Sequence, residues 1–311
     1  MSKTHSKPLS GGKEFAMYLI QRIEEAAARY NDARRSVALT ILDHRDELYS
    51  LSMQDIAELS CTSKATVVRF AQCLGYAGWK DFRKDYIAEL QYQNSHDDLV
   101  DTNYPFSKNS SQDEIARSIC LLMQQSAEET LQKLDLSMVT RAVNLIQRAS
   151  RVVIFCVSPH IYTAQLFARK MLTIQKSVQV CVAREMGITV RTLTSRDLAI
   201  IVSYAGNNPE AEPMKIADYL LANRIPTVVI TSEGSNYLRS RFSNVLSIPA
   251  RERLYTKIAT FATEEAVQLI FNTLFACYFG LNFEKNDTNK VHTAKFLEEQ
   301  ERRGGDLDVP A

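Results

Sequence analysis

The sequence predicts two domains, an all-α bundle followed by an α/β domain with a doubly wound parallel sheet. Three observations support this prediction. Residues 13–92 give one helical pattern after another, short β-branched runs alternate with helical runs from residue 151 onward, and a polar stretch separates the two parts. The 311 residues are enough for two domains of ordinary size.

Apolar residues at helical spacing predict the helices of the first domain. Phe15 to Tyr30 and Ser36 to Leu48 give the two longer patterns. Three shorter helices are expected at Ser52–Ser60, Ser63–Leu74 and Gly78–Gln91. No segment of this part alternates in the way that a half-buried strand does, so we expect a small helical bundle.

Residues 93–110 form the predicted linker, because they are polar, rich in Ser and Asn, and hold one Pro. The second domain is assigned to residues 111–283 and opens with two helices, Ser111–Leu134 and Ser137–Ala149. Residues 284–311 are a polar C-terminal tail, with one amphipathic helix expected around Val291–Arg303.

The α/β pattern consists of runs of consecutive apolar residues, which is typical of strands buried on both faces of a parallel sheet. The predicted strands are Arg151–Val157, Val178–Val182, Leu198–Ser203, Pro226–Thr231 and Val245–Ile248. The predicted helices between and after them are Ile161–Ile174, Pro209–Asn223 and Thr260–Phe279. Strands that alternate with helices indicate a doubly wound sheet.

Composition narrows the function classes. The net charge is +1, so DNA binding would have to come from a local patch rather than from a global field. Neither a signal peptide nor a membrane-spanning apolar run is found, and we expect a cytoplasmic protein. The six cysteines form no CxxC pair and have no histidine at zinc-ligand spacing, so we expect free thiols, no metal site and no cofactor.

Residues Met53–Leu74 have the pattern of a helix-turn-helix. The small residue Ala57 lets a second helix cross closely, and Ser63 is placed to cap that helix through its first free amides. The second helix has an inward apolar stripe made of Val67, Phe70, Ala71 and Leu74. One departure lies in the turn, where Cys61 stands in place of the usual Gly.

The stripe fixes which side chains of the second helix point outward. The N-terminal part of such a helix enters the major groove, where Lys and Arg reach guanine acceptors or phosphates and Ala or Thr touches a thymine methyl. The candidate DNA-binding residues are Ser63, Lys64, Ala65, Thr66 and Arg69, with Lys80, Arg83 and Lys84 on the next helix for the backbone. The alternative is an ordinary helical hairpin with a solvated polar face.

The stretch from Ser52 to Lys84, SMQDIAELSCTSKATVVRFAQCLGYAGWKDFRK, resembles the RpiR/MurR family of transcriptional regulators. The segments TVVRF and LGYAGWKDF carry this resemblance. It implies a helical domain that binds operator DNA, followed by a sugar isomerase (SIS) domain that senses a sugar phosphate and self-associates. On this basis we expect a regulator of carbohydrate genes, commonly a repressor, with no catalytic residues, a palindromic operator and a homodimeric or homotetrameric assembly.

Three turns at the carboxyl ends of the predicted strands are candidate parts of an effector site, because ligands of open parallel sheets bind there. They are Cys156–His160, Ser203–Pro209 and Thr231–Ser235. Their hydroxyls and amides suit an anion. The alternative is that these are plain strand-to-helix connections, which every such fold contains.

The resemblance also exposes departures from the family's phosphate-binding turns. Where a G-x-G-x-S turn is usual, the chain has Cys156-Val157-Ser158-Pro159-His160; Ser203 to Asn208 replaces S-x-S-G-x-T; and Ala262-Thr263-Glu264 replaces S-S-R. The changes remove or oppose anion-binding groups, at about 1.5–3 kcal/mol for each charge-assisted bond lost. A protonated His160 would compensate in part.

The candidate effector residues are Ser158, His160, Ser203, Gly206, Asn207, Asn208, Thr231, Ser235, Thr263 and Glu264. Three alternatives stay open: a sugar phosphate held in an altered way, a less anionic ligand, or a site that no longer binds. Two other functions compete with the regulator. One is a sugar-phosphate isomerase with an appended helical domain, whose nominal bases are Glu264, Glu265 and His160, and the other is a purely structural module that dimerises.

A helix-turn-helix reader commonly works as a dimer on a two-fold site. If the second domain also self-associates, a ligand bound between its subunits would change the spacing of two DNA-binding heads. The linker, residues 93–110, would transmit that change.

Overall fold

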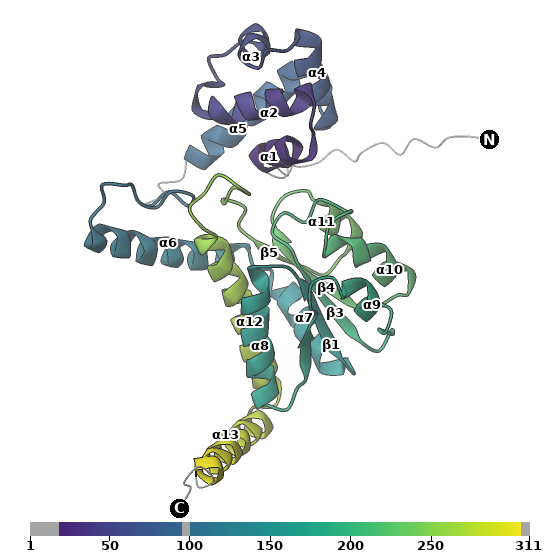
Figure 1. The fold of residues 1–311 in the computed structure, drawn as a ribbon. Helices are drawn as coiled ribbons and strands as arrows, with labels where there is room; N and C mark the ends of the chain where they lie inside the picture. Colours follow the sequence, from purple (N-terminus) through teal and green to yellow (C-terminus); the bar gives the residue numbers. More distant parts are fainter. Residues whose placement is uncertain (1–18, 95–99, 306–311) are drawn as a thin grey trace, which may run out of the picture.

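The computed structural model describes residues 19–94 and 100–305, and it contains the two predicted domains (Figure 1). The helical domain lies over one end of the α/β domain, and the long C-terminal helix extends from the opposite end. Parts of three predicted regions lie outside the described residues: residues 13–18 of the first domain, residues 95–99 of the linker and residues 306–311 of the tail.

The helical domain is built around one aromatic cluster. Its helices are α1 (Leu19–Arg29), α2 (Ala33–Asp43), α3 (Met53–Leu59), α4 (Lys64–Cys73) and α5 (Trp79–Asn94), with a short 3-10 helix at Arg45–Glu47. Phe82 of α5 lies at the centre and contacts the rings of Phe70, Tyr76, Trp79 and Tyr86. The predicted inward stripe of α4 is confirmed, since Val67, Phe70, Ala71 and Leu74 are buried.

The α/β domain opens with α6 (Gln112–Lys133) and α7 (Leu136–Arg148), and its five strands are all parallel in the order β2-β1-β3-β4-β5. The strands are β1 (Val152–Cys156), β2 (Val178–Val180), β3 (Leu198–Val202), β4 (Thr227–Ser232) and β5 (Val245–Ile248). The other helices are α8 (His160–Thr173), α9 (Met186–Val190), α10 (Ala217–Ala222), α11 (Tyr237–Arg241), α12 (Phe261–Leu281) and α13 (Phe283–Gly305), with a 3-10 helix at Met214–Ile216.

Helices cover both faces of this sheet, which confirms the doubly wound prediction. Alternate residues of β1 enter different cores: Ile154 packs with α7, α8 and α12, while Val153 and Phe155 pack with α9, α10 and α11. Burial on both faces explains why the strands read as continuous apolar runs. Because all five strands are parallel, their carboxyl ends lie at the same end of the sheet. This end, called the sheet edge below, faces the helical domain (Figure 1).

Some predicted elements differ from the observed ones. The helix expected at Pro209–Asn223 begins only at Met214, because a residue that precedes proline avoids the helical conformation and Pro213 follows Glu212. Two helices of five residues, α9 and α11, are too short to give a helical period and were not predicted. The tail helix is longer than expected, since α13 spans Phe283–Gly305.

The described part of the predicted linker packs against the α/β domain. Asn103 is buried; its side-chain amide donates to the carbonyl of Arg251 and its side-chain oxygen accepts from the amide of Arg253. Its backbone carbonyl also accepts from Ile258. This segment therefore holds the loop of residues 251–258 in place beside the sheet edge.

The helices of the described residues differ from membrane-spanning helices in length or composition. Within residues 19–94 and 100–305, no one helix has the length and apolar character that a crossing needs. The pair Phe261–Leu281 and Phe283–Glu299 reaches that threshold only when the two are joined across a bend of 109°.

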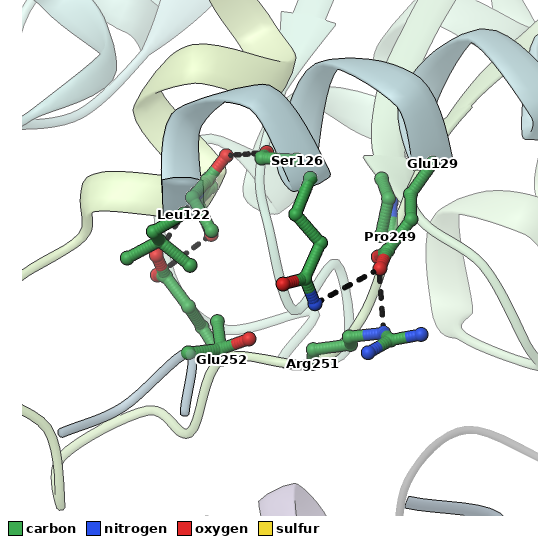
Figure 2. Close-up of a pocket in the computed structure, with 10 residues that line it drawn as sticks. Leu122, Ser126, Glu129, Pro249, Arg251 and Glu252 are labelled. Carbon is green, nitrogen blue, oxygen red and sulfur yellow. Dashed lines mark hydrogen bonds and ion pairs between the residues drawn. The ribbon is translucent and has the colours of Figure 1, made fainter. Parts of the chain in front are cut away.

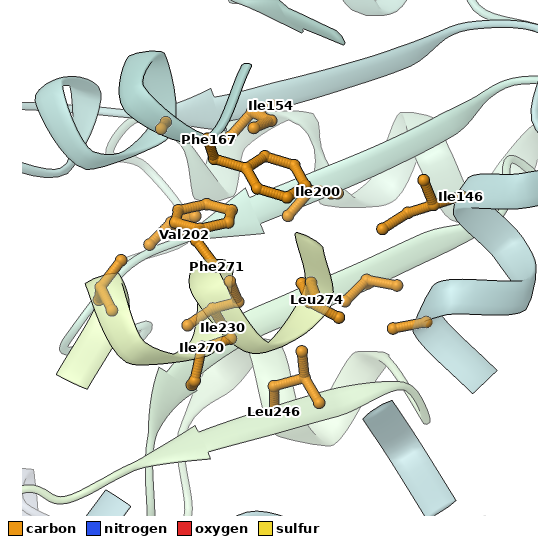
Figure 3. Packing of buried hydrophobic residues seen from close by; sticks show 14 of the residues in the cluster. Ile146, Ile154, Phe167, Ile200, Val202, Ile230, Leu246, Ile270, Phe271 and Leu274 are labelled. Carbon is orange, nitrogen blue, oxygen red and sulfur yellow. The ribbon is translucent and has the colours of Figure 1, made fainter. Parts of the chain in front are cut away.

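The stacked pair Phe167 and Phe271 offers a test of the larger core (Figure 3). The ring centroids are 4.8 Å apart and both side chains are buried. We expect Phe271→Ala to lower the free energy of unfolding by about 3–5 kcal/mol, because it leaves a cavity between α8 and α12. Urea unfolding followed by circular dichroism measures this, with Phe296→Ala on exposed α13 as the control. Equal losses in both variants would contradict the assigned core.

Candidate DNA-binding face and effector site

Local hydrogen bonds define the start of each helix in the helix-turn-helix. Ser52 caps α3 in a reciprocal capping box with Asp55. Ser63 caps α4, as predicted, by accepting a 3.2 Å hydrogen bond from the amide of Thr66. Between the helices Cys61 has φ of +50°, the left-handed conformation that usually calls for Gly. The turn therefore keeps its usual geometry despite the cysteine.

The predicted groove-facing side chains of α4 share one exposed surface. Ser63, Lys64, Ala65 and Arg69 are exposed and Thr66 is half-buried. The Nε of Arg69 donates to the carbonyl of Ala65, which folds its side chain along the helix. In Figure 1, α3 and α4 lie on the side of the helical domain away from the α/β domain, while α1 faces it. This leaves the start of α4 accessible to a DNA duplex.

The three basic residues predicted on α5 do not have equal freedom. Lys80 and Lys84 are exposed. Arg83 is half-buried, and its guanidinium donates to the backbone carbonyls of Leu48 and Tyr49. Arg83 thus braces the segment before α3, and a DNA contact by this residue stays a prediction.

The turn after β1 places its two predicted effector residues differently. Ser158 is exposed, whereas His160 is 5% exposed and begins α8. Burial, together with the nearby positive charge of Lys257, lowers the pKa of His160 to about 4. The imidazole is therefore neutral at pH 7 in this structure, and compensation for lost phosphate ligands by a protonated His160 stays a prediction.

The start of α12 is occupied by a carboxylate of the chain itself. Glu252 accepts hydrogen bonds from the amide of Thr263 at 2.9 Å and from its hydroxyl at 2.7 Å, and pairs with Lys257 at 2.9 Å. Figure 2 shows Glu252 and Glu129 beside a cavity at this point. That cavity measures about 10 Å³, roughly the room of one water molecule. The groups predicted to hold a phosphate at Thr263 are thus already bonded.

Glu264 does not face this cavity. It is exposed, and its carboxylate accepts a hydrogen bond from the hydroxyl of Thr260.

The turns after β3 and β4 are locked together. Gly206 has φ of +61°, and a Cβ there would lie 2.6 Å from Oγ1 of Thr231, so glycine is required. The Thr231 hydroxyl donates to the carbonyl of Tyr204 and accepts from Asn236. Ser203 accepts from the amide of Gly206. Three predicted effector residues therefore have an observed role in shaping the turns.

At the end of the turn after β3, the side chains of Asn207 and Asn208 bond to different partners. The side-chain oxygen of Asn208 accepts from the amide of Glu210, while the amide of Asn207 donates to both carboxylate oxygens of Glu25 at 3.4 Å.

A larger cleft lies between the two domains. Its volume is about 480 Å³, and two of the predicted effector residues, Asn207 and Ser235, line it. The α/β domain also contributes Asn236, Tyr237 and Ser240, and the helical domain contributes Arg22, Glu25, Ala26, Arg29, Tyr30, Cys73 and Leu74. No local sequence pattern indicated the residues that the helical domain contributes, because they belong to the other domain.

Helix α1 makes the principal polar contacts between the domains. Gln21 donates to the hydroxyl of Tyr204 at 3.0 Å and to the carbonyl of Glu252 at 2.9 Å. The carboxylate of Glu24 accepts from the amide of Leu254 at 2.6 Å and from the hydroxyl of Thr256 at 2.7 Å. Gln21 and Glu24 are 2% and 1% exposed, so this contact excludes solvent.

Comparison with known proteins agrees with this organisation. Residues 17–93 match the family described as helix-turn-helix domain, rpiR family. An HTH-type transcriptional regulator of Providencia stuartii is 25% identical over 270 residues, which cover 86% of this chain and 92% of that protein.

Two solved structures share the fold. The Vibrio vulnificus NanR protein complexed with ManNAc-6P covers 91% of this chain and 98% of its own, with a TM-score of 0.57 and 20% identity. The sugar isomerase domain of an RpiR transcription factor from Sphaerobacter thermophilus covers 61% of this chain and 99% of its own, with a TM-score of 0.50 and 16% identity. Residues 17–93 are thus a helix-turn-helix domain of the rpiR family, and the domain that follows has the fold of the sugar isomerase domain.

Proposed function

We propose that the chain binds operator DNA sequence-specifically, as a homodimer or homotetramer, and represses carbohydrate genes under the control of a sugar-phosphate-like effector. The observation that carries the DNA-binding part is the exposed start of α4. There Lys64, Ala65 and Arg69 stand clear of the α/β domain, beside a helix N-terminus whose cap, Ser63, is also exposed. Such a surface offers donors for guanine edges and for phosphates.

The effector class is supported by two observations. The fold is shared with NanR of Vibrio vulnificus, whose structure contains ManNAc-6P. The sheet edge of this chain, where ligands of open parallel sheets bind, faces the helical domain, so a ligand there contacts or adjoins the DNA-binding part.

The placement of two of the three nominal bases, His160 and Glu264, disfavours the competing isomerase hypothesis. A catalytic base must reach the proton that it removes. His160 is buried beside Lys257, and Glu264 lies on the surface bonded to Thr260. These placements favour regulation over turnover at the sheet edge.

Removal of the basic side chains of α4 tests DNA binding. We expect Lys64→Ala and Arg69→Ala each to weaken binding about 5- to 150-fold, the range that a lost base contact of about 1–3 kcal/mol gives. If a residue contacts phosphate instead, the slope of the logarithm of the binding constant against the logarithm of the salt concentration should decrease in magnitude by about one. Fluorescence anisotropy measures both effects, on DNA that the wild-type protein selects from a random library.

The matched controls are Lys290→Ala and Lys295→Ala, which remove exposed lysines of α13. Unchanged DNA affinity in the α4 variants, or an equal loss in the α13 variants, would sink the assignment of α4 as the recognition helix.

The buried His160 gives a pH prediction. The pKa of His160 falls from 6.5 to about 4 on folding. Between these two pH values the unfolded chain therefore binds a proton at this residue that the folded chain does not. The stability from neutral His160 is complete above pH 6.5 and is lost as the pH falls toward 4, by on the order of 3 kcal/mol. His160→Gln should therefore lose less stability than wild type between pH 7 and pH 4 in thermal unfolding. His292→Gln, at an exposed site on α13, should keep the wild-type slope.

A further inference from the structure

We infer that the cleft between the helical domain and the α/β domain binds the phosphate of a phosphorylated sugar, and that Arg22 and Arg29 of α1 supply the positive charge. This inference rests on the proposed function, in which an effector of that class controls DNA binding. It places the anion-binding groups on the DNA-binding domain itself rather than on the turns of the sheet.

One face of α1 lines the cleft. Arg22, Glu25, Ala26 and Arg29 follow the spacing i, i+3, i+4 and i+7, which puts them on one side of a helix. Arg22 lies over the ring of Tyr76 at 5.6 Å and Arg29 over that of Tyr30 at 5.8 Å. Within residues 19–94 and 100–305, neither guanidinium forms an ion pair at 4.0 Å or less. Arg22 shares a hydrogen bond with Tyr76, and both arginines interact with the charge of Glu25. Since neither is held in an ion pair within the described part of the chain, we expect both guanidinium groups to turn to a phosphate, which Arg binds through paired hydrogen bonds.

The remaining lining suits a sugar. Ser235 and Ser240 place hydroxyl groups in the lining, where they can bond to sugar hydroxyls. Asn207, which bonds to Glu25, and Tyr237, whose ring lies beside Arg241, complete this side of the cleft. A volume of about 480 Å³ lies within the range of about 300–1,000 Å³ typical of small-molecule sites.

Glu25 is the acidic residue that lines this cleft, and its position fits a hydroxyl-bearing ligand. Burial raises the pKa of Glu25, while the hydrogen bond from Asn207 and the charges of Arg22 and Arg29 lower it. Two guanidinium groups and one carboxyl leave an excess of positive charge even when Glu25 is ionised. A carboxylate accepts hydrogen bonds from sugar hydroxyls, so Glu25 favours a phosphorylated sugar over inorganic phosphate.

The usual cradle at the sheet edge is filled in this chain. The amide and hydroxyl of Thr263 bond to Glu252, Lys257 pairs with the same carboxylate, and the adjoining cavity holds about one water molecule. An anion at this edge would compete with a buried carboxylate. The cleft offers two arginines to one carboxyl, that of Glu25, and so keeps an excess of positive charge.

The cleft also reaches the recognition helix. Cys73 and Leu74, at the end of α4, line it, whereas Lys64 at the other end of the same helix faces outward. A ligand in the cleft would contact α1, the end of α4 and the α/β domain together. Its binding free energy would then depend on the domain arrangement that presents α4 to DNA, which is the condition for coupling.

Isothermal titration of the full-length protein tests the site. The probes are glucose 6-phosphate, fructose 6-phosphate and glucosamine 6-phosphate, each compared with its unphosphorylated sugar and with inorganic phosphate. We expect at least one phosphorylated sugar to bind more tightly than its parent and than phosphate. Arg22→Gln and Arg29→Gln should each weaken that binding tenfold or more, with partial recovery in the Lys variants. Arg117→Gln, at an exposed site on α6, should have no effect.

Thermal unfolding without ligand shows whether each variant is folded, and only folded variants are compared. Absence of binding by all three phosphorylated sugars overturns the inference, as does binding that both glutamine variants retain. Loss of binding in Lys257→Met with retention in both glutamine variants would place the site at the sheet edge instead.

The DNA assay separates this inference from the proposed function. The ligand should change the dissociation constant for DNA, and DNA should change that for the ligand by the same factor. A wild-type protein that binds no DNA would refute the proposed function whatever the cleft binds. DNA binding that persists while the cleft variants keep full ligand affinity would refute the cleft alone.

Discussion

The buried carboxylate of Glu24 fixes how the two domains meet. It is 1% exposed, and its charge is met by the amides of Leu254 and Thr256 and by the hydroxyl of Thr256. A buried carboxylate without such partners is costly, so α1 can leave this position only if water or another donor replaces them. Because α1 is rigid, the same contact sets where Arg22, Glu25 and Arg29 stand relative to the α/β domain.

A second buried carboxylate holds α1 within its own domain. Glu89 of α5 accepts from the amides of Leu19 and Ile20, which are among the unpaired donors at the start of a helix. Burial raises the pKa of Glu89 to about 7, although these two hydrogen bonds oppose that change. Helix α1 therefore has three faces in contact with different surroundings. Its apolar face packs in the helical core, Gln21 and Glu24 bond to the α/β domain, and a third face lines the cleft.

Periodicity predicted what depends on local patterns. The cap at Ser63, the buried stripe of α4 and the fully apolar strands follow from a few neighbouring residues, and they are found as expected. The helix start at Met214 and the five-residue helices α9 and α11 were missed because proline and short length hide the period. Comparison of the strand-to-helix turns with those of the family located the sheet edge as the candidate site. It did not show that Glu252 occupies the start of α12, since this contact joins residues from separate elements.

The interdomain contacts lie beyond the reach of any local pattern. Gln21 and Tyr204 are 183 positions apart, and Glu24 and Leu254 are 230 apart. Nothing near Arg22 or Arg29 in the sequence distinguishes them from solvated residues on an amphipathic helix. Their significance comes only from packing α1 over the turns after β3 and β4.

For a ligand in the proposed cleft, this packing would offer a shorter path to the helix-turn-helix than the predicted linker does. The described linker residue Asn103 holds the loop of residues 251–258, and that same loop receives Glu24. Linker, loop and α1 are thus one connected set of hydrogen bonds rather than separate routes. We expect a change in the cleft to reach α4 through the helices packed on α1, without first altering the spacing of two subunits. In the proposed homodimer or homotetramer, a quaternary rearrangement would then amplify a response that begins within a single chain.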